Sequence, residues 1–213
     1  MVAQTDFDRA QKLFDDKKYA QAISLFDKIV TENPNNEKAI EIIGDYYGQA
    51  KNWDKAIIYY RKLKTINPKN ATYWYKYGGV LGMKAKNSNR FVALGLISDI
   101  KFAFEKSLKL DPKHIDAHWA SIELYLQLPG ILGGSEEKAT NFSDNLMIIS
   151  TVDGHLSKAR IAEYQKNLKI AEKHYIAAHQ IANSKTTYQS LYDFYLHKLK
   201  DTSKAEKLKS QFK

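Results

Sequence analysis

Residues 22–34, AISLFDKIVTENP, and residues 56–68, AIIYYRKLKTINP, are two versions of one pattern placed 34 residues apart. In each version an alanine, an aromatic residue, an aliphatic residue and a closing proline follow at the same spacing. A fixed period of about 34 residues with these features is typical of repeats made of a helix, a turn and a second helix. Such repeats stack into extended surfaces, so the pattern favours a binding protein over an enzyme.

Composition is consistent with a helical protein that has an ordinary hydrophobic core. The chain has 213 residues, of which 44% are hydrophobic, and only 4 are proline. It contains no cysteine, which excludes disulfides, thiolate metal sites and cysteine nucleophiles. No stretch reaches the roughly 18 apolar residues that a membrane-spanning helix needs, so the sequence predicts no transmembrane segment.

The net charge of +9 raises the question of a polyanionic partner. Lysines alternate with acidic residues along most of the expected helices, and only residues 198–213 form a basic block. This pattern favours a solvated basic surface, and a nucleic-acid partner is not expected. Binding of nucleic acid or another polyanion through the basic surface remains the alternative function.

The first residues, Met1-Val2-Ala3-Gln4, run directly into the first expected helix. The Ala-Gln pair resembles the scar that a signal peptidase leaves. The protein is therefore expected to be exported or periplasmic if this is a trimmed junction, and cytoplasmic otherwise.

The second repeat resembles the tetratricopeptide repeat (TPR). Ile43-Gly44, Tyr47, Ala56, Tyr60 and Pro68 match its consensus, and Leu63 replaces a small residue. The resemblance implies an all-α protein, a right-handed α-solenoid of antiparallel helix pairs that forms one domain over residues 1–213. About six repeats are expected, near residues 3–36, 37–70, 71–112, 113–151, 152–183 and 184–213.

Two repeats depart from the regular spacing. Pro68 and Pro112 are 44 residues apart, which predicts a longer second helix in the third repeat, capped at Asn89 and running over 91–110. The fourth repeat contains the loop PGILGGS at 129–135, with Ser135 as the N-cap of the next helix. These insertions resemble a subset of bacterial TPR proteins, many of them exported.

In the TPR family the first helix of each repeat lines an inner groove. Aromatic residues, methionine and a few polar groups at these positions suit an extended or helical peptide. Gly79 and Gly82 either open the groove for a ligand or allow another helix to pack closely. The carboxylate clamp of some family members is absent, because Phe7, Gln11, Ile42 and Thr72 occupy most of its positions. The groove candidates are Phe7, Gln11, Phe14, Tyr75, Gly79, Met83, Tyr125, Arg160, Tyr164 and Phe194.

The long helix expected in the third repeat carries a second apolar surface, made of Phe91, Val92, Leu94 and Leu96. These residues are more apolar than a solvated projection should be. The helix either folds back onto residues 128–132 or offers a surface for a partner, which could also serve dimerisation.

Signatures of catalysis are missing from the sequence. It has no Gly-x-Ser-x-Gly, dinucleotide or His-Glu-x-x-His motif. His114 and His118 are one helical turn apart, but no third metal ligand is evident. We therefore expect a non-catalytic scaffold without cofactor or metal, which binds a protein or peptide in its groove. A small-ligand-binding envelope protein is a further alternative.

Overall fold

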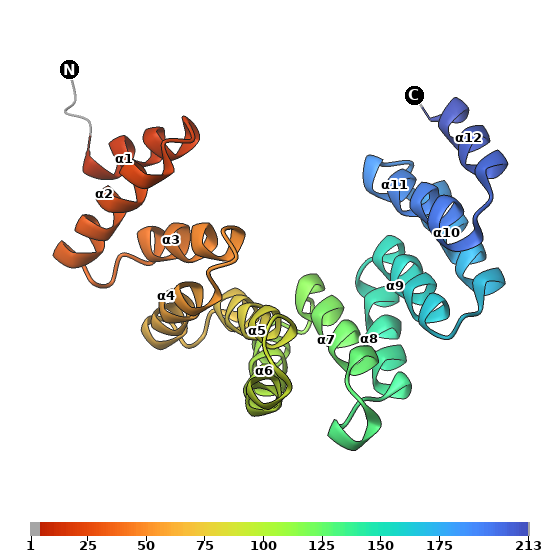
Figure 1. Ribbon diagram of the computed structural model, residues 1–213, viewed down its shortest axis with the longest axis horizontal. Coiled ribbons are helices and arrows are strands. Elements are labelled where there is room, and N and C mark those ends of the chain that lie inside the picture. Colours follow the sequence, from red (N-terminus) through yellow and green to blue (C-terminus); the bar gives the residue numbers. More distant parts are fainter. Residues whose placement is uncertain (1–4, 213) are drawn as a thin grey trace. The chain divides into compact units, whose positions relative to one another are not determined.

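The computed structural model of the protein describes residues 5–212, and in that range it contains twelve α-helices and no strand (Figure 1). The predicted signal-peptide junction at 1–4 lies outside the described residues. The helices are α1 Asp6–Asp15, α2 Tyr19–Glu32, α3 Glu37–Gln49, α4 Trp53–Ile66, α5 Ala71–Lys86, α6 Arg90–Leu110, α7 Ile115–Gln127, α8 Glu136–Ile149, α9 Thr151–Tyr164, α10 Leu168–Ala182, α11 Lys185–Asp193 and α12 Thr202–Gln211.

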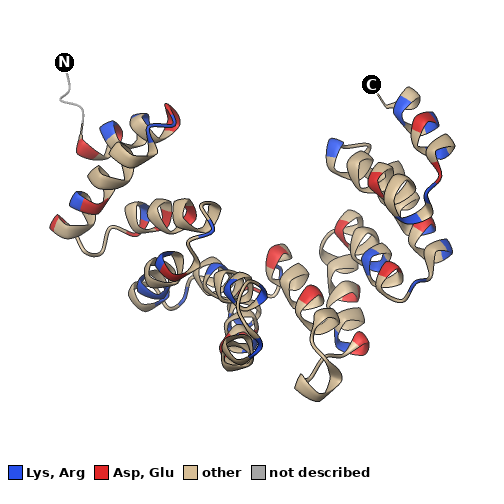
Figure 2. Cartoon of the chain, in the orientation of Figure 1, with Lys and Arg blue, Asp and Glu red and all other residues tan. Residues whose placement is uncertain are grey.

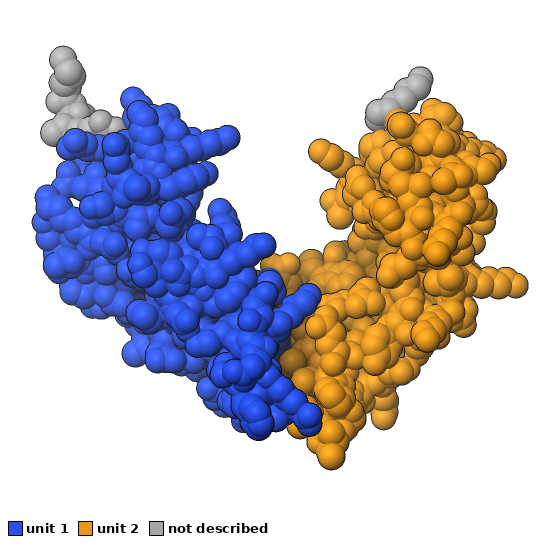
Figure 3. Space-filling model, viewed as in Figure 1, with its two compact units in different colours: residues 1–112 blue, residues 113–213 orange. Residues whose placement is uncertain are grey.

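The helices form six antiparallel pairs, from α1 with α2 to α11 with α12. The chain divides into two compact units, Met1–Pro112 and Lys113–Lys213 (Figure 3). Within each unit the second helix of a pair also packs on the first helix of the next pair. The predicted all-α stack of about six helix pairs is confirmed, whereas one continuous solenoid over 1–213 stays a prediction.

Each unit has its own buried core of small, aliphatic and aromatic residues. In unit 1 a core cluster joins α1, α2 and α3 around Phe26, which is fully buried. In unit 2 one cluster joins α7, α8 and α9 around Leu146, and another joins α9 to α12 around Phe194. Alanines at the contacts, such as Ala22 and Ala171, let neighbouring helices approach closely.

The third repeat is enlarged as the proline spacing predicts. Asn89 caps α6, its side chain accepting a hydrogen bond from the Val92 amide at 3.1 Å, and α6 extends over 21 residues. Its partner α5 is also long, at 16 residues, so the insertion lengthens both helices of the pair. A Cβ at Gly78 would lie 2.7 Å from the Phe104 ring, and this close packing explains that glycine.

The inserted loop of the fourth repeat is a compact turn. Its Gly130–Leu132 segment forms a short 3₁₀ helix, and Gly133 adopts a left-handed conformation with φ of 84°. Ser135 then caps α8, as predicted, by accepting a hydrogen bond from the Lys138 amide at 3.1 Å. Glycine suits this position because it adopts the left-handed conformation without the steric cost that a Cβ adds.

Candidate binding faces

In unit 1 the first helices α3 and α5 join through a cluster of charged side chains. The Lys76 Nζ donates hydrogen bonds to Glu41 Oε1 at 2.6 Å and to Asp45 Oδ1 at 2.8 Å. The hydroxyl of Tyr60, on α4, donates to the same Asp45 carboxylate. We call this surface the α3–α5 face and define it by Glu41, Asp45, Tyr75, Lys76, Gly79, Gly82 and Met83.

The surroundings shift the pKa values of Lys76 and Tyr60. Burial lowers the pKa of Lys76, but its hydrogen bonds to Asp45 and Glu41 outweigh that effect and leave the pKa above its ordinary value. Burial, followed by the hydrogen bond to Asp45, raises the pKa of Tyr60. The tyrosine therefore stays a neutral donor, and the two carboxylates share one ammonium group.

Unit 2 repeats this arrangement on α7, α9 and the segment after α11. The Arg160 guanidinium on α9 binds the Glu123 carboxylate on α7 through Nε at 2.7 Å and a second nitrogen at 3.0 Å. Glu163, also on α9, accepts a hydrogen bond from the Tyr175 hydroxyl at 2.8 Å and lies 3.3 Å from Lys198 Nζ. As in unit 1, a tyrosine from the second helix anchors an acid that pairs with a base one repeat later.

The acid and the base of each pair come from consecutive repeats. Lys76 follows Glu41 by 35 residues, and Arg160 follows Glu123 by 37. These pairs were not predicted from the sequence. The signal that could have indicated them is an acid and a base separated by about one repeat. Figure 2 shows residues of both signs on most helices, so the sequence offers each acid several possible basic partners.

A hollow of about 290 Å³ lies beside the Glu163 cluster in unit 2. The Phe194–Leu199 segment after α11 is a π-helix, whose wider turn holds three of the lining residues. Such wide turns are rare and are often found at functional sites. The hollow is lined by Glu163, Tyr175, Ser190, Asp193, Phe194, His197 and Lys198.

The predicted groove residues divide into accessible and buried ones. Met83 is 42% exposed and Tyr164 is 44% exposed, whereas Tyr125 is 7% and Phe194 only 2% exposed. Tyr125 stacks on Phe142 in the core of unit 2. Because Tyr125 and Phe194 are buried, little of their side-chain surface is accessible to a ligand, although Phe194 lines the hollow.

The predicted groove residues of the first repeat are half-buried. Phe7 packs edge-on against Phe26, and Phe14 packs edge-on against Tyr19. Gln11 donates a hydrogen bond to Asp15 at 2.9 Å. These contacts lie within the first repeat and its own core.

The two unexplained glycines of α5 border open space. A Cβ at Gly79 or at Gly82 would meet no atom within 4 Å. Close packing of another helix therefore does not account for them in the described structure. Tyr75, Gly79 and Met83 recur every fourth residue, so they share one stripe of α5 with this space between them.

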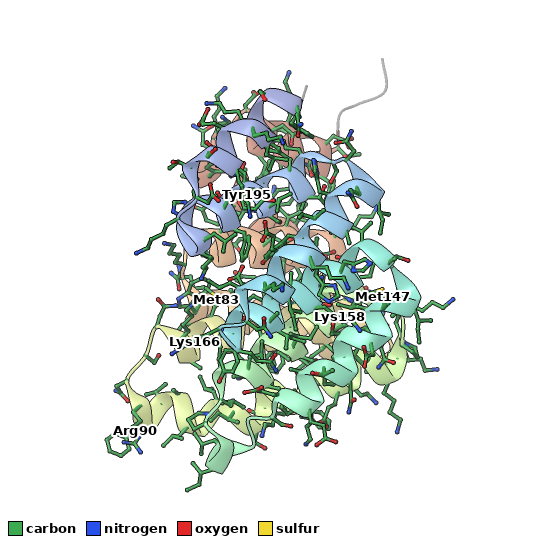
Figure 4. The ribbon with its side chains drawn as sticks, turned by 90° about the vertical axis from the view of Figure 1, so that its right-hand side faces the viewer. Met83, Arg90, Met147, Lys158, Lys166 and Tyr195 are labelled. Atoms are coloured by element: carbon green, nitrogen blue, oxygen red, sulfur yellow. The ribbon has the colours of Figure 1, made fainter. Side chains whose placement is uncertain are left out.

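The predicted second surface lies at the start of α6. Phe91 is 85% exposed, Val92 and Leu94 are also exposed, and Leu96 is half-buried. Arg90 begins this helix (Figure 4). The fold-back onto residues 128–132 stays a prediction.

Histidines account for one contact that the sequence did not suggest. His114 caps α7 through Nδ1, which accepts from the Ala117 amide at 3.3 Å, rather than pairing with His118 as a metal ligand set. His155 on α9 and His174 on α10 share a hydrogen bond between their Nδ1 atoms. Within residues 5–212 no group of three or more metal-ligating side chains gathers.

Across residues 5–212 no helix is long and apolar enough to cross a bilayer.

Comparisons with known proteins agree with this architecture. The family model for the tetratricopeptide repeat matches residues 37–70. A search of curated proteins found no match.

Three solved structures illustrate the likeness in fold. TTC0263, a TPR protein of Thermus thermophilus, has a TM-score of 0.67 at 14% identity, over 87% of this chain and 97% of that one. PilW, a type IV pilus biogenesis factor, has a TM-score of 0.68 at 17% identity, over 97% and 90%. YrrB, a TPR protein with an unusual peptide-binding site, has a TM-score of 0.57 at 15% identity, over 85% and 87%. Together with the six helix pairs, these matches show that the chain contains a tetratricopeptide repeat at residues 37–70 and has the fold of TPR proteins.

Proposed function

We propose that this protein is a non-catalytic interaction scaffold that binds a protein or peptide segment on its α3–α5 face. The TPR fold supports a protein-interaction role in general. The observation that carries the more specific proposal is the open space beside Gly79 and Gly82. Each glycine costs its helix about 1 kcal/mol relative to alanine, and no packing contact within 4 Å explains that cost.

The surroundings of this open space suit a peptide backbone. Tyr75 and Met83 flank Gly79 on α5, and Met83 is an adaptable apolar contact. The Lys76 cluster on the adjoining edge is held in place by its own hydrogen bonds, so its polar groups are already oriented for a ligand. Such preorganisation lowers the entropy that binding costs.

The charge of the face favours one class of peptide. Glu41, Asp45 and Lys76 together carry one more negative than positive charge. A segment with lysine or arginine is therefore expected to bind better than an acidic one. The absence of a carboxylate clamp agrees with this preference, since that clamp receives an acidic end.

The relatives support the proposal without identifying the partner. YrrB is described as having a peptide-binding site and PilW as a pilus biogenesis factor. The hollow lined by Glu163 and Asp193 in unit 2 offers a second acidic position for a basic side chain.

Peptides selected by phage display on the full chain, measured by fluorescence polarisation, test this function. The decisive variant is Gly79→Gln, which fills the open space with a helix-favouring side chain. Its matched control is Gly95→Gln, because Gly95 is a helical glycine of α6 that also borders open space. We expect Gly79→Gln to weaken binding about tenfold or more, equivalent to about 1.4 kcal/mol, and Gly95→Gln to leave it unchanged.

Other outcomes would contradict the proposal. Equal affinity of the Gly79→Gln variant and the unsubstituted chain would place the site elsewhere, and a loss confined to Gly95→Gln would place it on α6. If no peptide is enriched while oligonucleotides bind with a steep salt dependence, the polyanion alternative replaces it.

A further inference from the structure

Two histidines of the fifth repeat face each other outside the binding faces described above. His155 lies on α9 and His174 on α10, and their Nδ1 atoms are 2.9 Å apart. Their ring centroids are 5.2 Å apart, and the ring planes are tilted by 39°. Both side chains are only partly buried, so solvent and small ions reach them. Neither histidine contributes to the acid–base pairs or to the hollow.

The separation of these nitrogens matches that of two neighbouring ligands of one metal ion. Imidazole nitrogens bind first-row divalent metals at about 2.0–2.1 Å, so two of them at a right angle are about 2.9 Å apart. A tetrahedral ion would need about 3.3–3.4 Å. In the absence of an ion the two nitrogens share a hydrogen bond, so the ring that donates must carry its proton on Nε2 before both can bind one ion. Imidazole suits several divalent metals, and Cu²⁺ and Ni²⁺ lie at the tight end of the affinity series.

Lys158 lies near both rings. Burial and then Lys158 lower the pKa of His155. Burial, followed by His155, Lys158 and Lys173, lowers the pKa of His174.

A carboxylate partly neutralises the lysine that acts on both rings. Lys158, labelled in Figure 4, lies 2.8 Å from Asp144 on α8, which offsets much of its repulsion toward an incoming ion. Water molecules would occupy the remaining coordination positions of the ion.

We propose that His155 and His174 form a two-histidine site for a divalent transition metal, Cu²⁺ or Ni²⁺, which cross-links α9 and α10. Because the ion binds the folded arrangement of both helices, it stabilises unit 2. The site is independent of the peptide-binding proposal.

Calorimetric titration of the tag-free full chain with NiCl₂ or CuCl₂ tests the site, together with thermal unfolding in the presence of the ion or of EDTA. We expect one ion per chain and a rise in Tm of about 5 °C at saturation. His155→Gln and His174→Gln should each abolish most of both effects, and the double variant should lose no more, because a chelate needs both rings. The control is His179→Gln, also on α10 but outside this pair, which should bind the ion as the unsubstituted chain does.

A measurement without substitutions guards against variants that fold poorly. Substoichiometric Cu²⁺ should broaden the imidazole NMR signals of His155 and His174 before those of the other histidines. Absence of binding, equal broadening of all histidines, or losses in His179→Gln as large as those in His155→Gln would each overturn the proposal.

Discussion

At the scale of single residues, glycines in this protein serve opposite purposes. Gly154 on α9 faces the backbone of α8, and a Cβ there would lie 2.7 Å from Met147 N. Beside it the buried hydroxyls of Ser143 and Ser157 share a hydrogen bond of 2.7 Å, so small residues bring α8 and α9 together. Gly79 borders open space instead. The first glycine is needed for packing, and the second is free to serve binding.

This contrast predicts opposite effects of the same substitution. Gly154→Ala should destabilise the protein by about 1–3 kcal/mol, because the added methyl group meets backbone atoms that cannot yield easily. Gly79→Ala should stabilise it by up to about 1 kcal/mol, since alanine favours the helix and no atom opposes the methyl group. Urea denaturation followed by circular dichroism measures both changes. Equal stability of the two variants would show that the α8–α9 contact is looser than described.

At the scale of elements, the turn inside a repeat recurs in backbone conformation as well as in sequence. Lys17 and Lys51 both adopt left-handed conformations, with φ of 61° and 57°, and they are 34 residues apart. Lys166 and Lys200, with φ of 59° and 55°, are separated by the same period. The third and fourth repeats lack this lysine, and they are the two repeats with insertions. Regular spacing and a left-handed lysine therefore occur together, whereas the turn of the fourth repeat contains the left-handed Gly133.

The left-handed lysines predict a stabilising change. A side chain in this conformation costs roughly 1–2 kcal/mol, which glycine avoids, although glycine also gains freedom in the unfolded chain. Lys51→Gly should therefore raise the free energy of unfolding by up to about 1 kcal/mol. Arg61→Gly, at an exposed position inside α4, should lower it by about 1 kcal/mol. Denaturation curves of both variants test this, and a loss of stability in Lys51→Gly would contradict it.

At the scale of the whole molecule, the two units are built from the same kind of stack. Each holds three helix pairs, its own buried core and its own acid–base–tyrosine cluster. Repeat proteins are stabilised by contacts between neighbouring repeats rather than by one central core. Each unit therefore contains most of the contacts that it needs to fold.

Separate expression of the units tests this independence. Fragments 1–112 and 113–213 should each show a helical circular dichroism spectrum and a cooperative thermal transition, and the two spectra should add up to that of the full chain. An unfolded fragment would show instead that this unit depends on the other one. The same fragments would indicate which unit binds the selected peptides.

The amino-acid sequence by itself determined the helix pairs and their ends. The 34-residue spacing and the Asn89 and Ser135 caps could be inferred, because they depend on residues close together in the chain or on a repeated pattern. Left-handed Lys51, in contrast, carries no local signal comparable to glycine.

Only the tertiary structure decided which side chains meet between helices. The Glu41–Lys76 pair and the His155–His174 contact depend on the register of neighbouring helices and on side-chain rotamers. The exposed state of Met83 and the burial of Tyr125 depend on the same choices, although sequence register placed both in one groove. Periodicity assigns a residue to a face of its helix, but the packing of other helices determines what covers that face.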